Sequence, residues 1–162
     1  MKKIKIYFDT TVINNLDEPS MPEEMAIMQA LRGAIKQGVY DAVLSNVTLS
    51  EINATKDFEK LARLQNYLTE IPYDVIHTDD EIEHIADVIA KSGLLTSEKK
   101  RNDGLHIGCS LVSRADILLS NNFDDIVNAK TIMGVRKIAI VEGYGFIEIF
   151  SPKQMKIPKG EK

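Results

Sequence analysis

Cysteine is almost absent from this chain of 162 residues, in which Cys109 stands alone. A single cysteine cannot form an internal disulfide, so the sequence excludes a small cross-linked scaffold and favours a reducing compartment. No apolar run approaches the roughly 18 residues of a membrane span. The start, MKKIKIYFDTT, also lacks the apolar core of a signal peptide. We therefore expect a cytoplasmic protein without a membrane segment.

Glycine motifs that bind phosphate are missing as well. The sequence contains neither a Gly-x-Gly-x-x-Gly fingerprint nor a P-loop, so dinucleotide and nucleoside triphosphate chemistry lack their usual backbone cradle. Positive charge is not in excess either, since 20 basic and 24 acidic residues give a formal net charge of −4. That balance disfavours a protein that coats nucleic acid. An acidic protein can still act on a phosphodiester when bound metal ions neutralise its carboxylates.

The chain does have enough hydrophobic sequence for one core. Its hydrophobic content is 44%, and a chain of about 150 residues buries about 70% of its surface on folding. We assign residues 1–152 to one domain and residues 153–162, which contain four lysines, to a basic C-terminal tail.

Strand and helix patterns alternate along the domain. Alternating or short apolar segments predict strands over residues 4–8, 39–44, 75–76, 117–119 and 146–149. Apolar stripes and capping residues predict helices between Ser20 and Gly38, from Thr48, over 57–68, between Thr78 and Gly93, from Asn102, and over 126–133. Such alternation produces parallel strands joined by helices, so we predict an α/β fold, a three-layer α/β/α sandwich with a central, mainly parallel sheet.

Polar side chains from four separate segments are expected at one edge of that sheet. They are Asp9 after the first strand, Glu51 in the helix after the second, Asp103 in the helix before the 117–119 strand, and Asn122 after that strand. Ligands of open α/β sheets bind beyond the carboxyl ends of the strands. Carboxylate oxygens are the ligands that Mg²⁺ and Mn²⁺ prefer, so the three acids can hold one or two such ions. Ions held in this way can activate a water for attack on a phosphate.

Each of the four residues also has a structural interpretation. Asp9 and Asn122 can serve as turn residues, and Asp103 can complement the positive end of a helix. Glu51 can complete a capping box with Thr48. None of these interpretations requires the four residues to share one edge, so it is their joint placement that favours a site.

Several residues near the four candidates in sequence are expected to be mainly structural. His106 lies on the same helix side as Asp103 and is expected to pack against the site or line it, and Cys109 is expected to be buried. The acidic run over 74–87 indicates an exposed helix face. The basic run over 99–101 is typical of solvated surface, although its position just before Asp103 also suits a phosphate contact.

Four stretches of the chain, in this order, resemble the PIN domains, a family that includes toxins of the VapC type. They are YFDTTVI at 7–13, SNVTLSEI at 45–52, NDGLHI at 102–107 and ADILLSNNF at 115–123. The resemblance covers nearly the whole chain and implies a PIN-like fold and metal-dependent ribonuclease activity on RNA. It also implies that Asp9, Glu51 and Asp103 bind Mg²⁺ or Mn²⁺, and that a toxin of this kind is held in check by an antitoxin.

One departure from the family concerns the fourth acid. The family usually places it after the strand in a Thr-x-Asp pattern, where this chain has Ser120-Asn121-Asn122. Asn122, at the matching catalytic position, is a neutral ligand at best, although Asp124 and Asp125 lie close enough in sequence to substitute. Because a lost negative ligand weakens a second metal more than a first, a one-metal enzyme is a plausible form of this site.

Two other functions stay open on the sequence alone. Asp9-Thr10-Thr11 is similar to the Asp-x-Asp start of haloacid dehalogenase-type phosphatases, which act on small molecules, although the second acid is missing. The missing fourth acid also suits a PIN-like module that binds RNA or protein without cleaving it. Separately, Met25, Met28 and Leu31 form an apolar stripe that exceeds the needs of one core, from which we expect a homodimer.

Overall fold

β1 (Ile4–Phe8) is the middle strand of a five-stranded sheet in the computed structural model, which describes residues 2–157. The strand order is β3-β2-β1-β4-β5, and every neighbouring pair is parallel. The other strands are β2 (Tyr40–Ser45), β3 (Asp74–Ile76), β4 (Ile117–Leu119) and β5 (Glu148–Phe150). All five strands predicted from the sequence are confirmed, with ends shifted by one or two residues.

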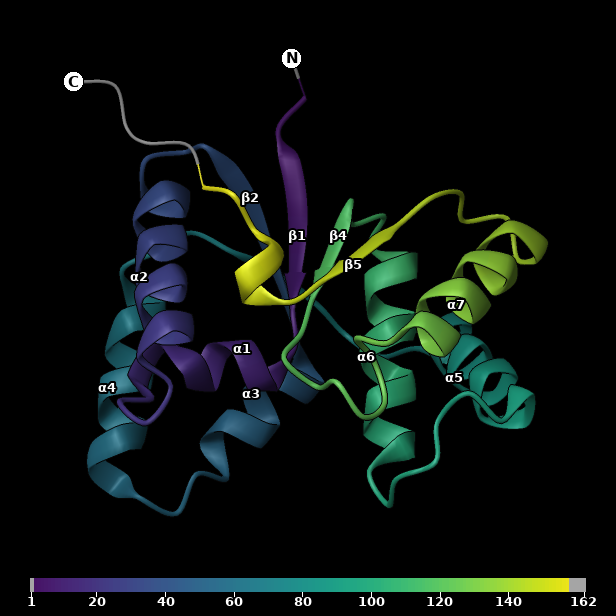
Figure 1. The fold of residues 1–162 in the computed structure, drawn as a ribbon, viewed down its shortest axis with the longest axis horizontal. Helices are drawn as coiled ribbons and strands as arrows, with labels where there is room; N and C mark the ends of the chain where they lie inside the picture. The colour runs from purple at the N-terminus through teal and green to yellow at the C-terminus, as the bar shows by residue number, and fades with distance from the viewer. Residues whose placement is uncertain (1, 158–162) are drawn as a thin grey trace.

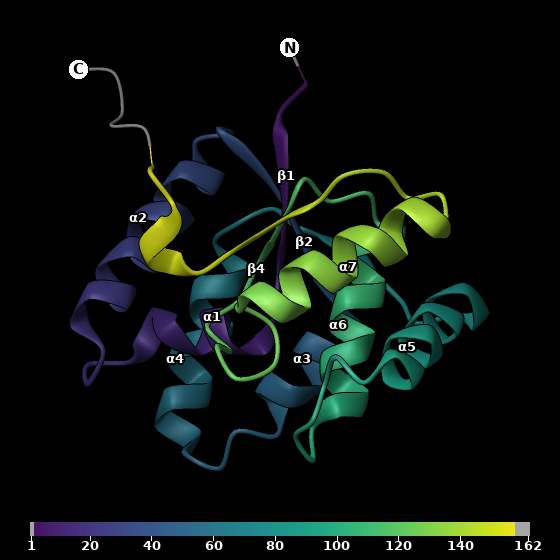
Figure 2. The ribbon, with the colours of Figure 1, turned by 45° about the vertical axis from the view of Figure 1, so that its right-hand side comes forward.

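Helices cover both faces of this sheet, as Figures 1 and 2 show. On one side lie α1 (Thr10–Asn14), the 3-10 helix η1 (Asn15–Asp17), α2 (Pro22–Lys36), α3 (Asn46–Asn53) and α4 (Phe58–Thr69). On the other lie α5 (Asp80–Ser92), α6 (Lys100–Val112) and α7 (Ala129–Val141). The predicted three-layer α/β/α fold is therefore confirmed.

Two hydrophobic clusters, one on each face of the sheet, form the core. Successive side chains of a strand point to opposite faces, so β1 contributes to both. Ile6 and Phe8 join the cluster beneath α2 and α4, whereas Tyr7 joins the cluster beneath α5, α6 and α7. Because β1 is buried on both faces, its carboxyl end leads directly into the interior, and Asp9 is held there.

Close packing of α5 against α6 depends on two glycines one helical turn apart. A Cβ atom at Gly104 would lie 3.5 Å from the Ala86 carbonyl oxygen, and one at Gly108 would lie 3.0 Å from the Ile82 carbonyl oxygen. Without side chains at these positions, the backbones of the two helices approach closely. This contact fixes the position of α6, which carries Asp103 and His106.

Several helices begin at residues other than those predicted. The predicted cap Ser20 instead donates to Glu18. α2 begins at Pro22. Proline is favoured at the first position of a helix, because a backbone N–H there would have no acceptor within the helix. α5 is capped by Asp79 rather than Thr78. α6 begins at Lys100, so Asn102 lies within its first turn instead of capping it.

The helix predicted after β4 is present, but it begins later and is longer than predicted. A helix was expected over 126–133, but α7 is capped by Asn128, begins at Ala129 and ends at Val141. The short helix α1 directly after β1 was not predicted.

The methionine-rich stripe of α2 belongs to the core. Met28 and Leu31 are almost fully buried against the sheet, whereas Met25 is half-buried, so two of the three side chains from which a homodimer was expected are not available at the surface. At the other end of the chain, the predicted tail begins inside the 3-10 helix η2 (Pro152–Gln154), and Met155 and Ile157 pack against the core. Residues 158–162 of that tail lie outside the described residues. Within residues 2–157, no helix combines the length and hydrophobicity needed to cross a bilayer.

Candidate functional site

A single cavity of about 730 Å³ brings together the four residues singled out from the sequence. It lies beyond the carboxyl ends of β1 and β4, where Asp9 and Asn122 leave the sheet, and it is closed by α3 and α6, which supply Glu51 and Asp103. The edge predicted to carry the site is thus the edge at which the cavity occurs, as expected for a parallel α/β sheet.

Asp9 has a structural role and also faces the cavity. Its Oδ1 accepts hydrogen bonds from Thr11 Oγ1 at 2.6 Å and from the Val12 amide at 3.2 Å, which caps α1. Its Oδ2 accepts a hydrogen bond from Ser120, at the end of β4. Burial raises the pKa of Asp9, although nearby His106 and these donors oppose the rise. The turn interpretation is therefore correct as far as it goes, but it does not remove Asp9 from the site.

The capping interpretation of Glu51 is wrong. Ser45 caps α3, because its Oγ accepts a hydrogen bond from the Thr48 amide at 3.1 Å, and Thr48 instead donates to the Phe8 carbonyl. Glu51 is therefore free to face the cavity, where its Oε1 accepts from Thr10 Oγ1 at 2.7 Å. Burial alone would raise the pKa of Glu51, but hydrogen bonds, the strongest from His106, bring it below its ordinary value. Glu51 is accordingly ionised at neutral pH.

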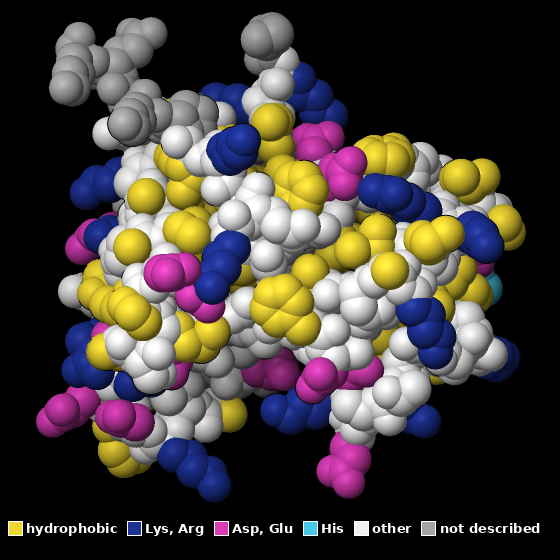
Figure 3. Space-filling view, viewed as in Figure 1, with side chains coloured by type: hydrophobic (Ala, Val, Ile, Leu, Met, Phe, Trp, Pro, Cys, Tyr) yellow, Lys and Arg dark blue, Asp and Glu magenta, His cyan; other side chains and the backbone are white. Residues whose placement is uncertain are grey.

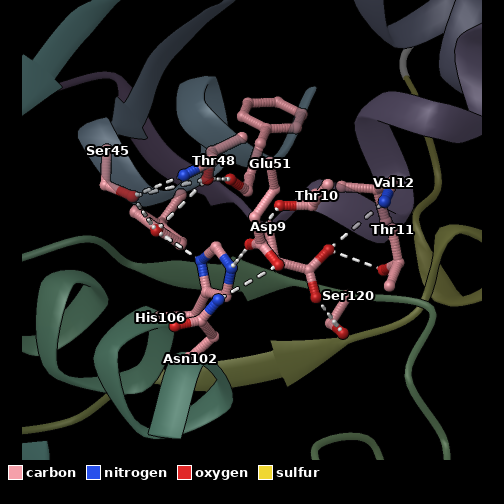
Figure 4. A network of polar contacts seen from close by, with 12 residues as sticks. Asp9, Thr10, Thr11, Val12, Ser45, Thr48, Glu51, Asn102, His106 and Ser120 are labelled. Carbon is pink, nitrogen blue, oxygen red and sulfur yellow. Dashed lines mark hydrogen bonds and ion pairs between the residues drawn. The ribbon is translucent and has the colours of Figure 1, made fainter. Parts of the chain in front are cut away.

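His106 is the residue whose importance the sequence did not reveal. Its Nε2 lies 2.7 Å from Glu51 Oε1 and its Nδ1 lies 2.7 Å from the Tyr7 hydroxyl. Figure 4 shows His106, on α6, and Glu51, on α3, pointing toward each other, with Asp9 flanked by Thr11 and Ser120. Because Glu51 is ionised, Nε2–H is the donor of that bond, and the Tyr7 hydroxyl can donate to Nδ1. The spacing of His106 three residues after Asp103 was the only sequence signal for this arrangement.

Asp103 is buried without full hydrogen bonding. Its Oδ2 has no partner among the described residues. Burial, reinforced by the neighbouring Asp125 carboxylate, raises the pKa of Asp103 to about 7. Asp125 is buried too, and its Oδ1 accepts from the Thr96 amide at 3.2 Å. Burial would raise the pKa of Asp125, but donors from Ser97 and Thr96 bring it below its ordinary value. The two carboxylates therefore form a buried acidic pair that a cation would stabilise.

Asn122 mainly organises the loop after β4. Its Oδ1 accepts from the Asp125 amide at 3.1 Å, and its backbone carbonyl accepts from the amides of Ile126 and Val127. The turn interpretation of Asn122 is thus confirmed, although the residue also lines the cavity.

The basic run over 99–101 divides between the cavity and the surface. Lys99 lines the cavity. Arg101 points elsewhere and forms ion pairs with Glu83 and Asp87 on α5. Only the first residue of the run is therefore placed to meet a phosphate in the cavity.

The side chains around the cavity suit a hard divalent cation. Within residues 2–157, no three His, Cys, Asp or Glu side chains are grouped closely enough to enclose an ion. The donors are nonetheless carboxylate oxygens from separate elements, and Asp103 Oδ2 is buried with no hydrogen bond to satisfy it. Oxygen donors of this kind fit Mg²⁺ or Mn²⁺. Thr10 and His106 both donate to Glu51 Oε1, so binding of an ion by Glu51 requires that oxygen to accept fewer hydrogen bonds or the ion to use Oε2.

Comparison with known proteins reveals similarity in structure rather than in sequence. No protein-family model matches the chain, and no curated protein matches it. Among solved structures, the fold is similar to the crystal structure of VapBC2 from Rickettsia felis bound to a DNA fragment from their promoter. The match has a TM-score of 0.55 and 11% sequence identity, and covers 91% of this chain and 98% of the other. The two chains therefore share a fold.

Proposed function

We propose that this protein is a PIN-like, metal-dependent endoribonuclease in which Asp9, Glu51 and Asp103 hold Mg²⁺ or Mn²⁺. The observation that carries the proposal is the convergence of these three carboxylates on one cavity, with a buried Asp103 oxygen left unpartnered. An ion bound there would lower the pKa of a nearby water and would offset negative charge on the phosphate oxygens. The resemblance to PIN domains and the shared fold support the same chemistry.

The residues around the carboxylates have distinct parts in this proposal. His106 keeps Glu51 ionised and oriented, because its ring is held on the other side by the Tyr7 hydroxyl. Ser120 and Thr11 fix the two oxygens of Asp9. Such partners of ligating groups set ligand geometry and basicity, so we regard His106 as a positioning residue rather than a catalytic one.

Asp125 is the better candidate for the fourth acid of the site. The side-chain oxygen of Asn122 accepts a hydrogen bond within the loop, whereas the Asp125 carboxylate is buried beside that of Asp103 and lines the same cavity. Asp124, the other nearby acid, is exposed at the rim. We infer that Asp103 and Asp125 together supply the negative charge that the asparagine lacks.

The proposed biological role is that of a toxin with an antitoxin protein as its partner. The motifs resemble VapC-type toxins, and the similar structure is the VapBC2 assembly. The outward side of α7 exposes Met133, Ile140 and Val141, which could contact a protein partner. Figure 3 shows hydrophobic side chains over this part of the molecule. We propose that these side chains contribute to the surface that the antitoxin covers.

RNA cleavage with a controlled metal supply tests the proposed activity. Purified protein should cleave RNA with Mg²⁺ or Mn²⁺ and lose that activity in EDTA, while Asp9→Asn, Glu51→Gln and Asp103→Asn should each be inactive under the same conditions. Equal cleavage by all three variants would show that a contaminating nuclease is responsible. Hydrolysis of phosphomonoesters without cleavage of RNA would instead favour the phosphatase alternative.

A further inference from the structure

An exposed aromatic ring stands at the rim of the acidic cavity. Phe123 lines the cavity directly after Asn122, yet 54% of its surface is exposed to solvent. Its neighbours in the loop, Asn121, Asn122 and Asp124, are all polar and line the same cavity. Phe123 is the one hydrophobic side chain among the residues that line the cavity. Packing within the hydrophobic core therefore does not account for an aromatic residue at this position.

The loop that carries Phe123 is held in place by hydrogen bonds. Asn128, the cap of α7, donates from Nδ2 to the Phe123 carbonyl at 3.2 Å and to the Asp124 carbonyl at 3.1 Å. On the other side, the Asn121 amide donates to Thr11 Oγ1 at 2.8 Å, and Thr11 in turn donates to Asp9. The ring is therefore presented by a preorganised backbone that is tied to a proposed metal ligand.

The charged lining of the cavity is mostly acidic, with six Asp and Glu side chains and one lysine. Lys99 lines the cavity, and neither Lys99 nor Lys100 has an ion-pair partner within residues 2–157. In an RNA strand bound across the cavity, one phosphate would lie near the cation held by the carboxylates. The neighbouring phosphates would need other positive charges, and unpaired lysine side chains can supply them.

We propose that Phe123 is a stacking platform for an unpaired base of the RNA next to the phosphate that is cleaved. This inference rests on the proposed function and adds a specificity-determining residue to it. Every base has a flat face, so one fixed ring can hold strands of differing sequence, and a base within a duplex cannot reach it. The ring thus selects unpaired RNA over paired RNA and sets the position of the strand over the carboxylates.

Binding measurements with and without bases on the strand test this role. The probes are a fluorescein-labelled single-stranded RNA pool of mixed sequence and an abasic ribose–phosphate strand of the same length, with Kd measured by fluorescence anisotropy in Ca²⁺. The wild-type protein should prefer the pool, and Phe123→Ala should weaken pool binding roughly 5- to 100-fold while leaving the abasic strand unchanged. Phe123→Trp should restore the preference.

Two matched variants separate stacking from simple apolar contact and from loss of fold. Phe123→Leu keeps the hydrophobic volume without a ring and should behave like Phe123→Ala. Phe58, at the start of α4, is 82% exposed and does not line the cavity, so Phe58→Ala should bind like the wild type. All variants should keep the wild-type melting temperature.

The results distinguish failure of this inference from failure of the proposed function. If the wild type cleaves the pool in Mn²⁺ but Phe123→Ala binds both probes as the wild type does, the stacking role is wrong and the nuclease proposal stands. Full rescue by Phe123→Leu would also overturn stacking. If the wild type neither binds nor cleaves the pool, both proposals fail together.

Discussion

His106 Nε2 lies 2.7 Å from Glu51 Oε1, while its Nδ1 lies 2.7 Å from the hydroxyl of Tyr7. The three residues come from α6, α3 and β1, so one buried imidazole on α6 links the central strand to α3 beside the cavity. Tyr7 also contacts Ser45, the cap of α3, at 2.7 Å between hydroxyl oxygens. The position of Glu51 is therefore set by buried groups of the core rather than by its own helix.

Replacing His106 should reduce both metal affinity and the free energy of unfolding. His106→Asn removes the donor to Glu51, and loss of such a partner typically costs about 10- to 100-fold in metal affinity or activity. It also leaves the buried Tyr7 hydroxyl with one partner fewer, which should cost about 1–3 kcal/mol of unfolding free energy. Mn²⁺ titration by calorimetry and urea unfolding measure the two effects.

His84 provides the matched control for that experiment. It is exposed and pairs with Glu142 on the surface, away from the cavity. His84→Asn should leave Mn²⁺ affinity and cleavage at wild-type values. Equal losses in the two histidine variants would show that His106 has no special role in positioning Glu51.

Much of the fold could be predicted because its elements follow simple periodicities. β1 alternates and is buried on both faces, and the short apolar segment of β4 has few ways to be buried except as a central parallel strand. The convergence of Asp9, Glu51, Asp103 and Asn122 followed from topology alone, since parallel strands bring their carboxyl ends to one edge.

Local choices between neighbouring residues could not be predicted in the same way. Ser45 and Thr48 are both good caps, and only the tertiary bond from Thr48 to the Phe8 carbonyl decides between them. α7 carries apolar residues on its exposed side as well as its buried side, among them Ile140 and Val141, so its helical period was obscured. The pairing of Asp103 with Asp125 depends on how the first turn of α6 meets the loop after β4, which spacing does not encode.

Two glycine substitutions should change stability in opposite directions. In Gly108→Ala the new Cβ would lie 3.0 Å from the Ile82 carbonyl oxygen, a backbone atom that cannot move without separating α5 from α6. Gly33→Ala in α2 meets nothing within 4 Å and gains helix propensity. We expect Gly33→Ala to raise the free energy of unfolding by about 0.5–1 kcal/mol and Gly108→Ala to lower it by about 1–3 kcal/mol, as measured by urea unfolding. Stabilisation by Gly108→Ala would contradict the close packing of these helices.

Cys109 should be unreactive in the native protein. Its side chain is fully buried, and burial raises the pKa of the thiol to about 11. Only the thiolate reacts with iodoacetamide, so native protein should resist alkylation between pH 7 and 9, whereas protein unfolded in urea should react readily. The unfolded thiol loses its proton at lower pH than the folded one, so this group makes stability fall as pH rises above about 9. Rapid alkylation of native protein at pH 8 would show that the surroundings of Cys109 open to solvent.

The three carboxylates should respond to neutral substitution as metal ligands and not as structural caps. Asp9→Asn, Glu51→Gln and Asp103→Asn keep side-chain shape while removing negative charge. Without metal, we expect Asp9→Asn to be about as stable as the wild type and Glu51→Gln to be less stable, because the lowered pKa of Glu51 means that its charge stabilises the native state. Asp103→Asn should be more stable than the wild type at pH 8, because Asp103 and Asp125 no longer repel each other. Mn²⁺ at about 100 times its Kd should stabilise the wild type by about 2.7 kcal/mol, which is roughly 5–10 °C in melting temperature for a domain of this size.

In the variants that metal-induced shift should shrink to a few degrees or vanish. Asp124→Asn, which neutralises the exposed acid at the rim, is the control and should retain the wild-type shift. Asp125→Asn should lose part or all of it if Asp125 is the fourth acid. Thermal melting with and without Mn²⁺ measures all five variants in one experiment. A full Mn²⁺ shift in Asp9→Asn, Glu51→Gln and Asp103→Asn alike would mean that these side chains only hold turns and that the ion, if one binds, is held elsewhere.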